Sequence, residues 1–232
     1  MGTEGARALL ERAGTLNLQT GNLLSWGCGR KKCPSTPSEE VSGRIWASLR
    51  DRWNGKVEKG CTLEREVMNI ISDSKLFIVG SNSSSIRDAV DMACASLGVA
   101  QLDSVIIAPP PVEDGTSLSL EYLQPYWQEL ETLVENKKIV AIGTSDLDKT
   151  LLEQLYIWAQ VRTNFLIVAF PRQNFVELLC EASFQEVLQE SIQNVRAHEW
   201  IPLWILRYSV IVKSRGIIKS KGYIMQAKRN AS

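Results

Sequence analysis

The sequence has no excess of one charge and no long apolar run. It has 232 residues, with 26 Lys and Arg against 26 Asp and Glu, so its charge gives no reason to expect binding to nucleic acid or to a membrane. Apolar runs such as SVIIAPPPV are far shorter than a membrane-spanning helix. The N-terminus, MGTEGARALLERAGTL, has no apolar signal core, and Ala6 stands where a myristoylation signal has Ser or Thr. These absences predict a cytosolic chain.

Histidine and cysteine are also scarce, which limits metal and thiol chemistry. An odd number of scattered cysteines without an export signal favours reduced thiols. Cys28 and Cys33 in GCGRKKCP have no second pair with which to form a metal site, and ordinary thiols are favoured over redox-active ones despite the neighbouring cations. For His198, the single histidine, we favour a structural or exposed role over a catalytic one. No Walker-type loop is present to bind ATP. The five cysteines are Cys28, Cys33, Cys61, Cys94 and Cys180.

From Lys75 onward, short apolar runs alternate with stretches of helical periodicity. The apolar runs predict strands at KLFIVG, SVIIA, IVAIG, NFLIVAFP and WILRYSVIVKS. Between them, apolar residues recur at helical spacing around residues 86–97, 123–134, 151–159 and 184–195. Strands that alternate with helices in this way predict a parallel sheet. Upstream, residues 1 to about 25 suggest a first helix.

Two turns after predicted strands invite a functional interpretation. SNSSS could cradle an anion through its hydroxyl groups, but we favour a helix N-cap, with Ser85 and Asp88 as a capping box and Gly98 closing the helix. In KKIVAIGTSDLDKT, a strand, a polar turn and a helix follow one another, and this junction is where parallel α/β proteins place their functional residues. Gly143 in this segment is interpreted as structural.

The strand phrases resemble those of the aldo/keto reductase superfamily. The resemblance rests on GVAQLDSVIIAPPP, LVENKKIVAIGTSDLDKTLLEQL and RYSVIVKSRG. It implies an α/β fold, a TIM-barrel-like β/α barrel of the kind that transfers hydride from NADPH to a carbonyl. Residues 44–74 and 163–180 are shorter than the family pattern, and a full barrel usually needs about 250 residues. We therefore expect an incomplete barrel over residues 44–232, preceded by an extension of helix and loop over residues 1–43.

Longer phrases are similar to the regulatory-subunit family of glutamate–cysteine ligase. They include TGNLLSWG, RKKCPSTPSEE, LSLEYLQPYW, EASFQEVLQESI and LRYSVIVKSRGIIKSKGYI. The resemblance implies a non-catalytic regulator that forms a heterodimer with the ligase catalytic subunit in glutathione biosynthesis. It also implies better use of glutamate and weaker feedback inhibition by glutathione. ATP and Mg²⁺ belong to that partner, and no metal site is expected in this chain.

The reductase chemistry needs a Tyr acid, a Lys that lowers the pKa of the Tyr, and a His that orients substrate. The resemblance places the His position at Ala108 and the Lys position at Ser81. The Tyr position falls within residues 44–74, yet no tyrosine precedes Tyr122. Since neither Ala nor Ser can replace the missing groups, we predict no catalytic residues. The alternative is an NADPH-dependent aldo/keto-reductase-like oxidoreductase that takes its acid from elsewhere.

Part of a cofactor site is retained in the sequence. Ser145 matches the serine that touches the nicotinamide amide in the superfamily, while Asp146 replaces an Asn and cannot donate a hydrogen bond when ionised. Lys213, Ser214 and Arg215 match the superfamily segment that lies near the cofactor phosphate. We predict that these three residues and Ser145 form a vestigial NADPH site. The alternative for these basic residues is a solvated face or a partner contact.

The C-terminal third also holds the predicted partner interface. The candidates are Trp200, Trp204, Arg207, Lys213 and Arg215, because Trp and Arg are favoured at interface hot spots. An equally weighted alternative places the two tryptophans in the barrel core. A third hypothesis is that the shortened segments leave the chain unable to fold or to bind.

Overall fold

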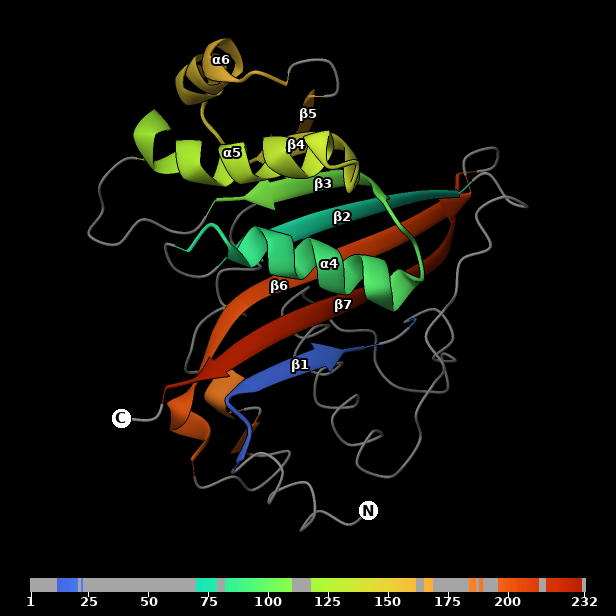
Figure 1. Ribbon diagram of the computed structural model, residues 1–232, viewed down its shortest axis with the longest axis vertical. Helices are drawn as coiled ribbons and strands as arrows, with labels where there is room; N and C mark the ends of the chain where they lie inside the picture. Colours follow the sequence, from blue (N-terminus) through green and yellow to red (C-terminus); the bar gives the residue numbers. More distant parts are fainter. Residues whose placement is uncertain are drawn as a thin grey trace.

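A computed structural model shows one seven-stranded sheet with helices along one of its faces (Figure 1). The strand order is β1-β7-β6-β2-β3-β4-β5. The elements are β1 (Thr15–Gln19), β2 (Ile70–Ile78), α4 (Ser85–Leu97), β3 (Leu102–Ala108), α5 (Leu120–Glu135), β4 (Ile139–Ser145), α6 (Lys149–Trp158), β5 (Phe165–Val168), the 3-10 helix η2 (Ala197–Glu199), β6 (Trp200–Val212) and β7 (Ile217–Arg229). The structure describes residues 12–20, 22, 70–78, 82–109, 118–161, 165–168, 184–186, 188–189, 196–212 and 216–230.

One half of the sheet has the predicted parallel arrangement. Strands β2, β3, β4 and β5 are parallel neighbours, and α4, α5 and α6 lie between them in the chain. The strands are nearly continuous apolar runs because a parallel sheet with helices on it buries most of its residues. The alternation of strands and helices predicted from Lys75 to residue 168 is therefore confirmed.

The other half of the sheet is antiparallel, which corrects the fully parallel sheet that we predicted. Strand β6 runs antiparallel to both β2 and β7, and β1 runs antiparallel to β7. The chain passes from β6 at Val212 to β7 at Ile217, and so short a connection can join only antiparallel neighbours. The first helix predicted for residues 1–25 is wrong at Thr15–Gln19, where β1 forms.

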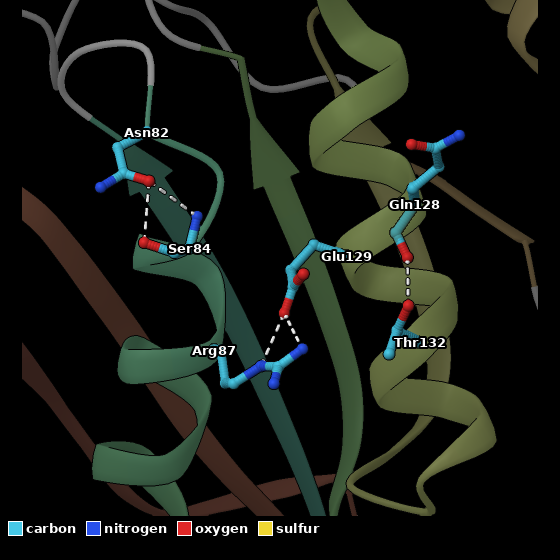
Figure 2. Close-up of polar contacts among 6 residues, drawn as sticks. All are labelled: Asn82, Ser84, Arg87, Gln128, Glu129 and Thr132. Carbon is cyan, nitrogen blue, oxygen red and sulfur yellow. Dashed lines mark hydrogen bonds and ion pairs between the residues drawn. The ribbon is translucent and has the colours of Figure 1, made fainter.

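Helix α4 follows its predicted apolar stripe closely, but its first turn is built differently. Gly98 ends the helix in the left-handed conformation, at φ 66°. Ser84, rather than Ser85, occupies the N-cap position, and its side chain makes no capping bond. Instead, the Asn82 side-chain oxygen accepts hydrogen bonds from the Ser84 amide and hydroxyl at 3.0 and 2.8 Å (Figure 2). The predicted capping box is therefore replaced by an Asn-centred turn.

Helices α4 and α5 lie side by side and contact each other. Arg87 of α4 donates from Nε to Glu129 of α5 at 2.8 Å, and Thr132 donates to the Gln128 carbonyl within α5 (Figure 2). Helix α6 begins where the Asp148 side chain accepts from the Leu151 amide at 2.9 Å, a standard N-cap. No helix among the described residues is long and apolar enough to cross a membrane.

The two faces of the sheet bury separate apolar clusters, because successive strand residues point to opposite faces. Trp204, Leu206 and Tyr208 of β6 pack in the cluster that includes α4 and α5. Ile205 lies in the second cluster, with Tyr223 and other side chains of β7 and β1. We call the face of the sheet that carries Ile205 and Tyr223, opposite the helices, the inner face. Lys75 and Phe77 belong to it, since they alternate with Leu76 and Ile78 of the helical face.

The predicted barrel is incomplete in the part of the chain that the structure describes. The sheet has two ends, β1 and β5, each of which pairs with one neighbour there. Strand β1 comes from the predicted extension, residues 1–43, and adds to the same sheet. The predicted boundary at residue 44 lies outside the described residues, as do most of the shortened segments 44–74 and 163–180.

Candidate functional site at the carboxyl ends of the parallel strands

The candidate site lies where the parallel strands β3 and β4 end. Ala108 is the last residue of β3, Ser145 is the last residue of β4, and Asp146 follows directly. The adjacent pairing of β3 with β4 sets these strand ends beside each other. Carboxyl ends of strands are where open and closed parallel sheets hold ligands. The structure thus assembles Ala108 and Ser145 at one edge of the sheet.

Ser145 is buried and its hydroxyl is used by the sheet itself. Ser145 is 1% exposed, and its Oγ donates a hydrogen bond to the Ile107 carbonyl oxygen at 3.5 Å. That carbonyl belongs to the neighbouring strand β3. A hydroxyl held against the adjacent strand offers little to a ligand beyond the sheet edge. The predicted nicotinamide contact of Ser145 remains a prediction.

Asp146 turns the chain sharply at the end of β4. Its φ of 66° lies in the left-handed region, which Asp tolerates better than most residues because its short side chain bonds locally. The carboxylate oxygen Oδ2 lies 3.6 Å from the Nζ of Lys75, and both side chains are largely shielded from water. The residue that replaces the family's Asn is therefore held by an ion pair from β2.

Lys75 is the charged centre of the inner face. Its ammonium lies 5.1 Å from the centroid of the Phe77 ring, and its side chain is 12% exposed. Burial lowers the pKa of Lys75, the Asp146 carboxylate opposes that effect, and the charge of Arg207 adds to the lowering. The ion pair stabilises the charged amine at a depth where an unpaired one would be costly.

Arg207, a predicted interface residue, lies on the inner face opposite Lys75. The antiparallel pairing of β2 with β6 sets Lys75 and Arg207 directly opposite each other. Arg207 is half-buried. Its contact with a partner remains a prediction.

The predicted interface tryptophans lie in the core. Trp200 and Trp204 are 1% and 0% exposed. The Nε1 of Trp204 donates to Gln226 Oε1 at 3.1 Å, and Gln226 Nε2 donates to Asn17 Oδ1 at 3.1 Å, so one polar chain crosses β6, β7 and β1. The core location, which sequence reasoning gave equal weight, is the one that the structure adopts. In this conformation neither indole is available to a partner.

Several residues singled out from the sequence lie outside the described part of the chain. They are Ser81, Lys213, Ser214 and Arg215, with Cys28, Cys33, Cys61 and Cys180. Of the residues that the structure does describe, Cys94 is buried in α4 and is in no disulfide. His198 is exposed in η2, and its carbonyl accepts from Gln185 Nε2 at 3.0 Å.

Sequence reasoning missed the Lys75–Asp146 pair. Lys75 was interpreted only as the start of a strand, and Asp146 only as a defect in amide recognition. The available signal was a lysine at the start of an apolar strand that is buried on both faces. Such a lysine needs an acidic partner, so an ion pair could have been expected. Pairing residues 71 positions apart in sequence, however, requires the strand order.

Strand order and helix placement together define the class of protein: an α/β protein whose single seven-stranded sheet is part parallel and part antiparallel. No protein-family model matches the chain. Similar solved structures include an aldose reductase from Schistosoma japonicum, at 20% identity and a TM-score of 0.38 over 62% of this chain and 51% of that one. An aldose reductase from Giardia lamblia matches at 18% identity and a TM-score of 0.39 over 65% and 61% of the two chains.

Curated relatives are much closer in sequence. The glutamate–cysteine ligase regulatory subunits of Bos taurus and Homo sapiens are each 58% identical to this chain, over 275 aligned positions that cover 100% of both proteins. This chain belongs to the glutamate–cysteine ligase regulatory subunit family. Because it has 232 residues, the relatives carry segments that it lacks, in keeping with the shortening predicted from the sequence.

Proposed function

We propose that this chain forms a heterodimer with the catalytic subunit of glutamate–cysteine ligase and enhances its activity without catalysing a reaction itself. The observation that carries the proposal is the 58% identity to named regulatory subunits over the full length of both chains. Enhancement means better use of glutamate and weaker feedback inhibition by glutathione. ATP and Mg²⁺ bind to the partner in this proposal, and the complex is cytosolic.

The geometry of the strand ends supports a non-catalytic role. Ala108, at the position that the resemblance assigns to the substrate-orienting His, has no side-chain donor or acceptor. Ser145 donates to a strand carbonyl, and Asp146 is paired with Lys75. A carboxamide entering this edge would have to displace both contacts. These arrangements favour a scaffold over a working reductase site.

A regulator acts by binding one conformation of its partner better than another. The free energy of that difference sets how far the partner's equilibrium moves, and coupling energies are typically about 1–3 kcal/mol, or roughly 5- to 150-fold in affinity. Arg207, Lys213 and Arg215 are proposed as contacts on this chain. Trp200 and Trp204 act in the proposal only by holding the C-terminal strands in place.

The test is a titration of the chain into purified catalytic subunit, with initial rate followed at low glutamate in the presence of glutathione. The proposal expects a saturable rise in rate and co-elution of the two proteins. If a chain with a cooperative thermal transition produces neither, the proposal is wrong and the segments absent from this chain carry the contact.

The reductase alternative is tested on the same preparation. A reductase quenches NADPH fluorescence on binding and oxidises NADPH when an aldehyde is supplied. We expect no turnover. Quenching without turnover would support the vestigial NADPH site at Ser145, Lys213, Ser214 and Arg215, and turnover would overturn the non-catalytic assignment.

A further inference from the structure

The connected ends of β6 and β7 carry two pairs of aliphatic residues. Val212 lies opposite Ile217, and Ile211 lies opposite Ile218. We call these four residues the aliphatic tip of the β6–β7 hairpin. In Figure 1, both strands continue past the end of α4 toward the tip. The tip therefore lies beyond the part of the strands that α4 covers.

A β-bulge at Lys219 forms one of the two aliphatic pairs. Val210 lies opposite Ser220. The next residue of β6, Ile211, lies opposite Ile218, so Lys219 is one residue more than β6 can pair with. Without the bulge, Ile211 would lie opposite Lys219 and the aliphatic pair would not form. The register shift thus gathers aliphatic residues at the tip.

The aliphatic tip is exposed to water. Ile217 and Ile218 are 55% and 44% exposed, and Ile211 and Val212 are partly exposed. None of the four belongs to either apolar cluster of the sheet. Single apolar residues are common on protein surfaces, whereas adjacent ones that form a patch are typical of interaction sites. The tip therefore has the character of a docking surface.

The charge of the hairpin indicates the kind of partner. No acidic residue follows Glu199 in the sequence, although the whole chain has a net charge of zero. On the neighbouring strand β2, Asp73 lies opposite Ser209, further from the tip. A second copy of the chain would bring like charges together across a symmetric contact, which is unfavourable. An acidic partner surface is complementary instead. The basic residues after Glu199 are Arg207, Lys213, Arg215, Lys219, Lys221, Lys228 and Arg229.

We propose that the aliphatic tip is the surface with which this chain binds the glutamate–cysteine ligase catalytic subunit. It fits an apolar depression on that subunit, flanked by acidic side chains. Aliphatic burial supplies affinity, and the opposite charges orient the two proteins. Val212 directly precedes Lys213 in the sequence, so the tip adjoins a contact already proposed. This inference rests on the proposed function and names the contact surface within it.

The test is the affinity of the full chain and its variants for purified catalytic subunit, measured by surface plasmon resonance and by the rise in rate at low glutamate. In I217D we expect the apparent Kd to weaken about tenfold or more, because apolar burial is lost and a negative charge faces an acidic surface. I157D is the matched control: it makes the same change at a residue of α6 that is 71% exposed. I157D should bind as the unaltered chain does.

The outcomes separate this inference from the proposed function. If the unaltered chain neither binds nor activates the catalytic subunit, the proposed function fails and the inference fails with it. If the unaltered chain and I217D bind equally, the proposed function stands and the tip is not the contact. Equal weakening in I217D and I157D would also overturn the inference. Self-association of the unaltered chain that I217D abolishes would show that a second copy covers the tip, contrary to the proposal.

The acidic character of the partner surface has its own measurement. The apparent Kd of the unaltered chain should weaken as sodium chloride is raised, because salt screens charges that are exposed at the rim of an interface. An affinity that does not change with salt would overturn the acidic surface.

Folding of the variant is checked by its urea midpoint. Ile217 lies outside both apolar clusters, so the midpoint of I217D should match that of the unaltered chain. Asp is unfavourable in strands, and if I217D fails to fold, I217T keeps a branched side chain that strands favour and removes part of the apolar surface. A weaker apparent Kd in I217T supports the tip as the contact, and an unchanged one refutes it.

Discussion

Glu131 offers the sharpest test of what holds the helical layer to the sheet. This carboxylate is buried in α5, with 7% of the residue exposed. Its Oε1 accepts three hydrogen bonds, from Trp127 Nε1 at 3.1 Å, the Gln160 amide at 2.7 Å and the Val161 amide at 2.9 Å. The two amides lie just beyond the end of α6. One side chain therefore fastens α5 to the segment that leads toward β5.

The substitution E131A removes the acceptor and leaves three donors behind. Each buried donor left without a partner costs about 1–3 kcal/mol, and water that enters the site recovers part of that sum. We expect a loss of about 3–5 kcal/mol in the free energy of unfolding, the range seen when one partner of a buried charged contact is removed. For a chain of this size, that loss corresponds to a fall in Tm of roughly 6–20 °C.

The assay is urea unfolding followed by far-ultraviolet circular dichroism and by tryptophan fluorescence. E131Q keeps an acceptor oxygen but loses the charge, and charge-assisted bonds are roughly twice as strong as neutral ones. It should therefore lie between E131A and the unaltered chain.

E135A is the matched control, one turn further along α5. Glu135 is exposed, and a negative charge at a helix C-terminus is unfavourable, so its loss should be neutral or slightly stabilising. If E131A and E135A unfold within about 0.5 kcal/mol of each other, the usual spread of surface substitutions, the three hydrogen bonds do not hold the layer and the reasoning is wrong.

Two further predictions concern the C-terminal strands. The Arg229 guanidinium donates to Glu199 at 2.5 Å and lowers the pKa of that carboxyl from its ordinary 4.5. The stabilisation of the folded state by the Glu199–Arg229 pair is therefore present above pH 4.5 and is lost as the pH falls through the lowered pKa of Glu199. Between pH 6 and pH 3, Tm should therefore fall less steeply in R229Q than in the unaltered chain. Parallel curves for the two proteins would contradict this prediction. W204A should lose about 3–5 kcal/mol by leaving a cavity, while W204F should lose less because a six-membered aromatic ring remains and only the rest of the indole, with its bond to Gln226, is removed. If W204F weakens activation of the catalytic subunit while its urea midpoint is unchanged, Trp204 contacts the partner after all.

The helices and parallel strands were predictable because their signals are local. The stripe that includes Ile86, Val90 and Leu97 has helical period, and Gly98 closes it with a left-handed turn that glycine adopts without strain. The first strand, β1, was missed because TLNLQ is short and alternates apolar and polar residues next to a helical pattern. Strand β7 was missed because, in IIKSKGYIMQAKR, the first two isoleucines are followed by Lys, Ser, Lys and Gly, residues that interrupt a strand pattern.

The candidate site was predicted in part. The strand–turn–helix phrase around Ser145 located the edge of the sheet, and the resemblance located Ala108. The hydrogen bond from Ser145 to Ile107 and the pairing of Asp146 with Lys75 could not be predicted, because each joins segments that only strand order brings together. The same limit applied to Trp204, for which sequence alone could not separate a core position from an interface.

The sequence by itself determined the α/β class, the regulatory-subunit resemblance and the absence of a tyrosine before Tyr122. These depend on composition and on patterns that span a few residues. Tertiary structure alone decided which charges meet. It set Lys75 opposite Arg207 and beside Asp146, and it directed Glu131 to the end of α6. The reason is physical: electrostatic and hydrogen-bond energies depend on distance and burial, and neither is defined until the strands have paired.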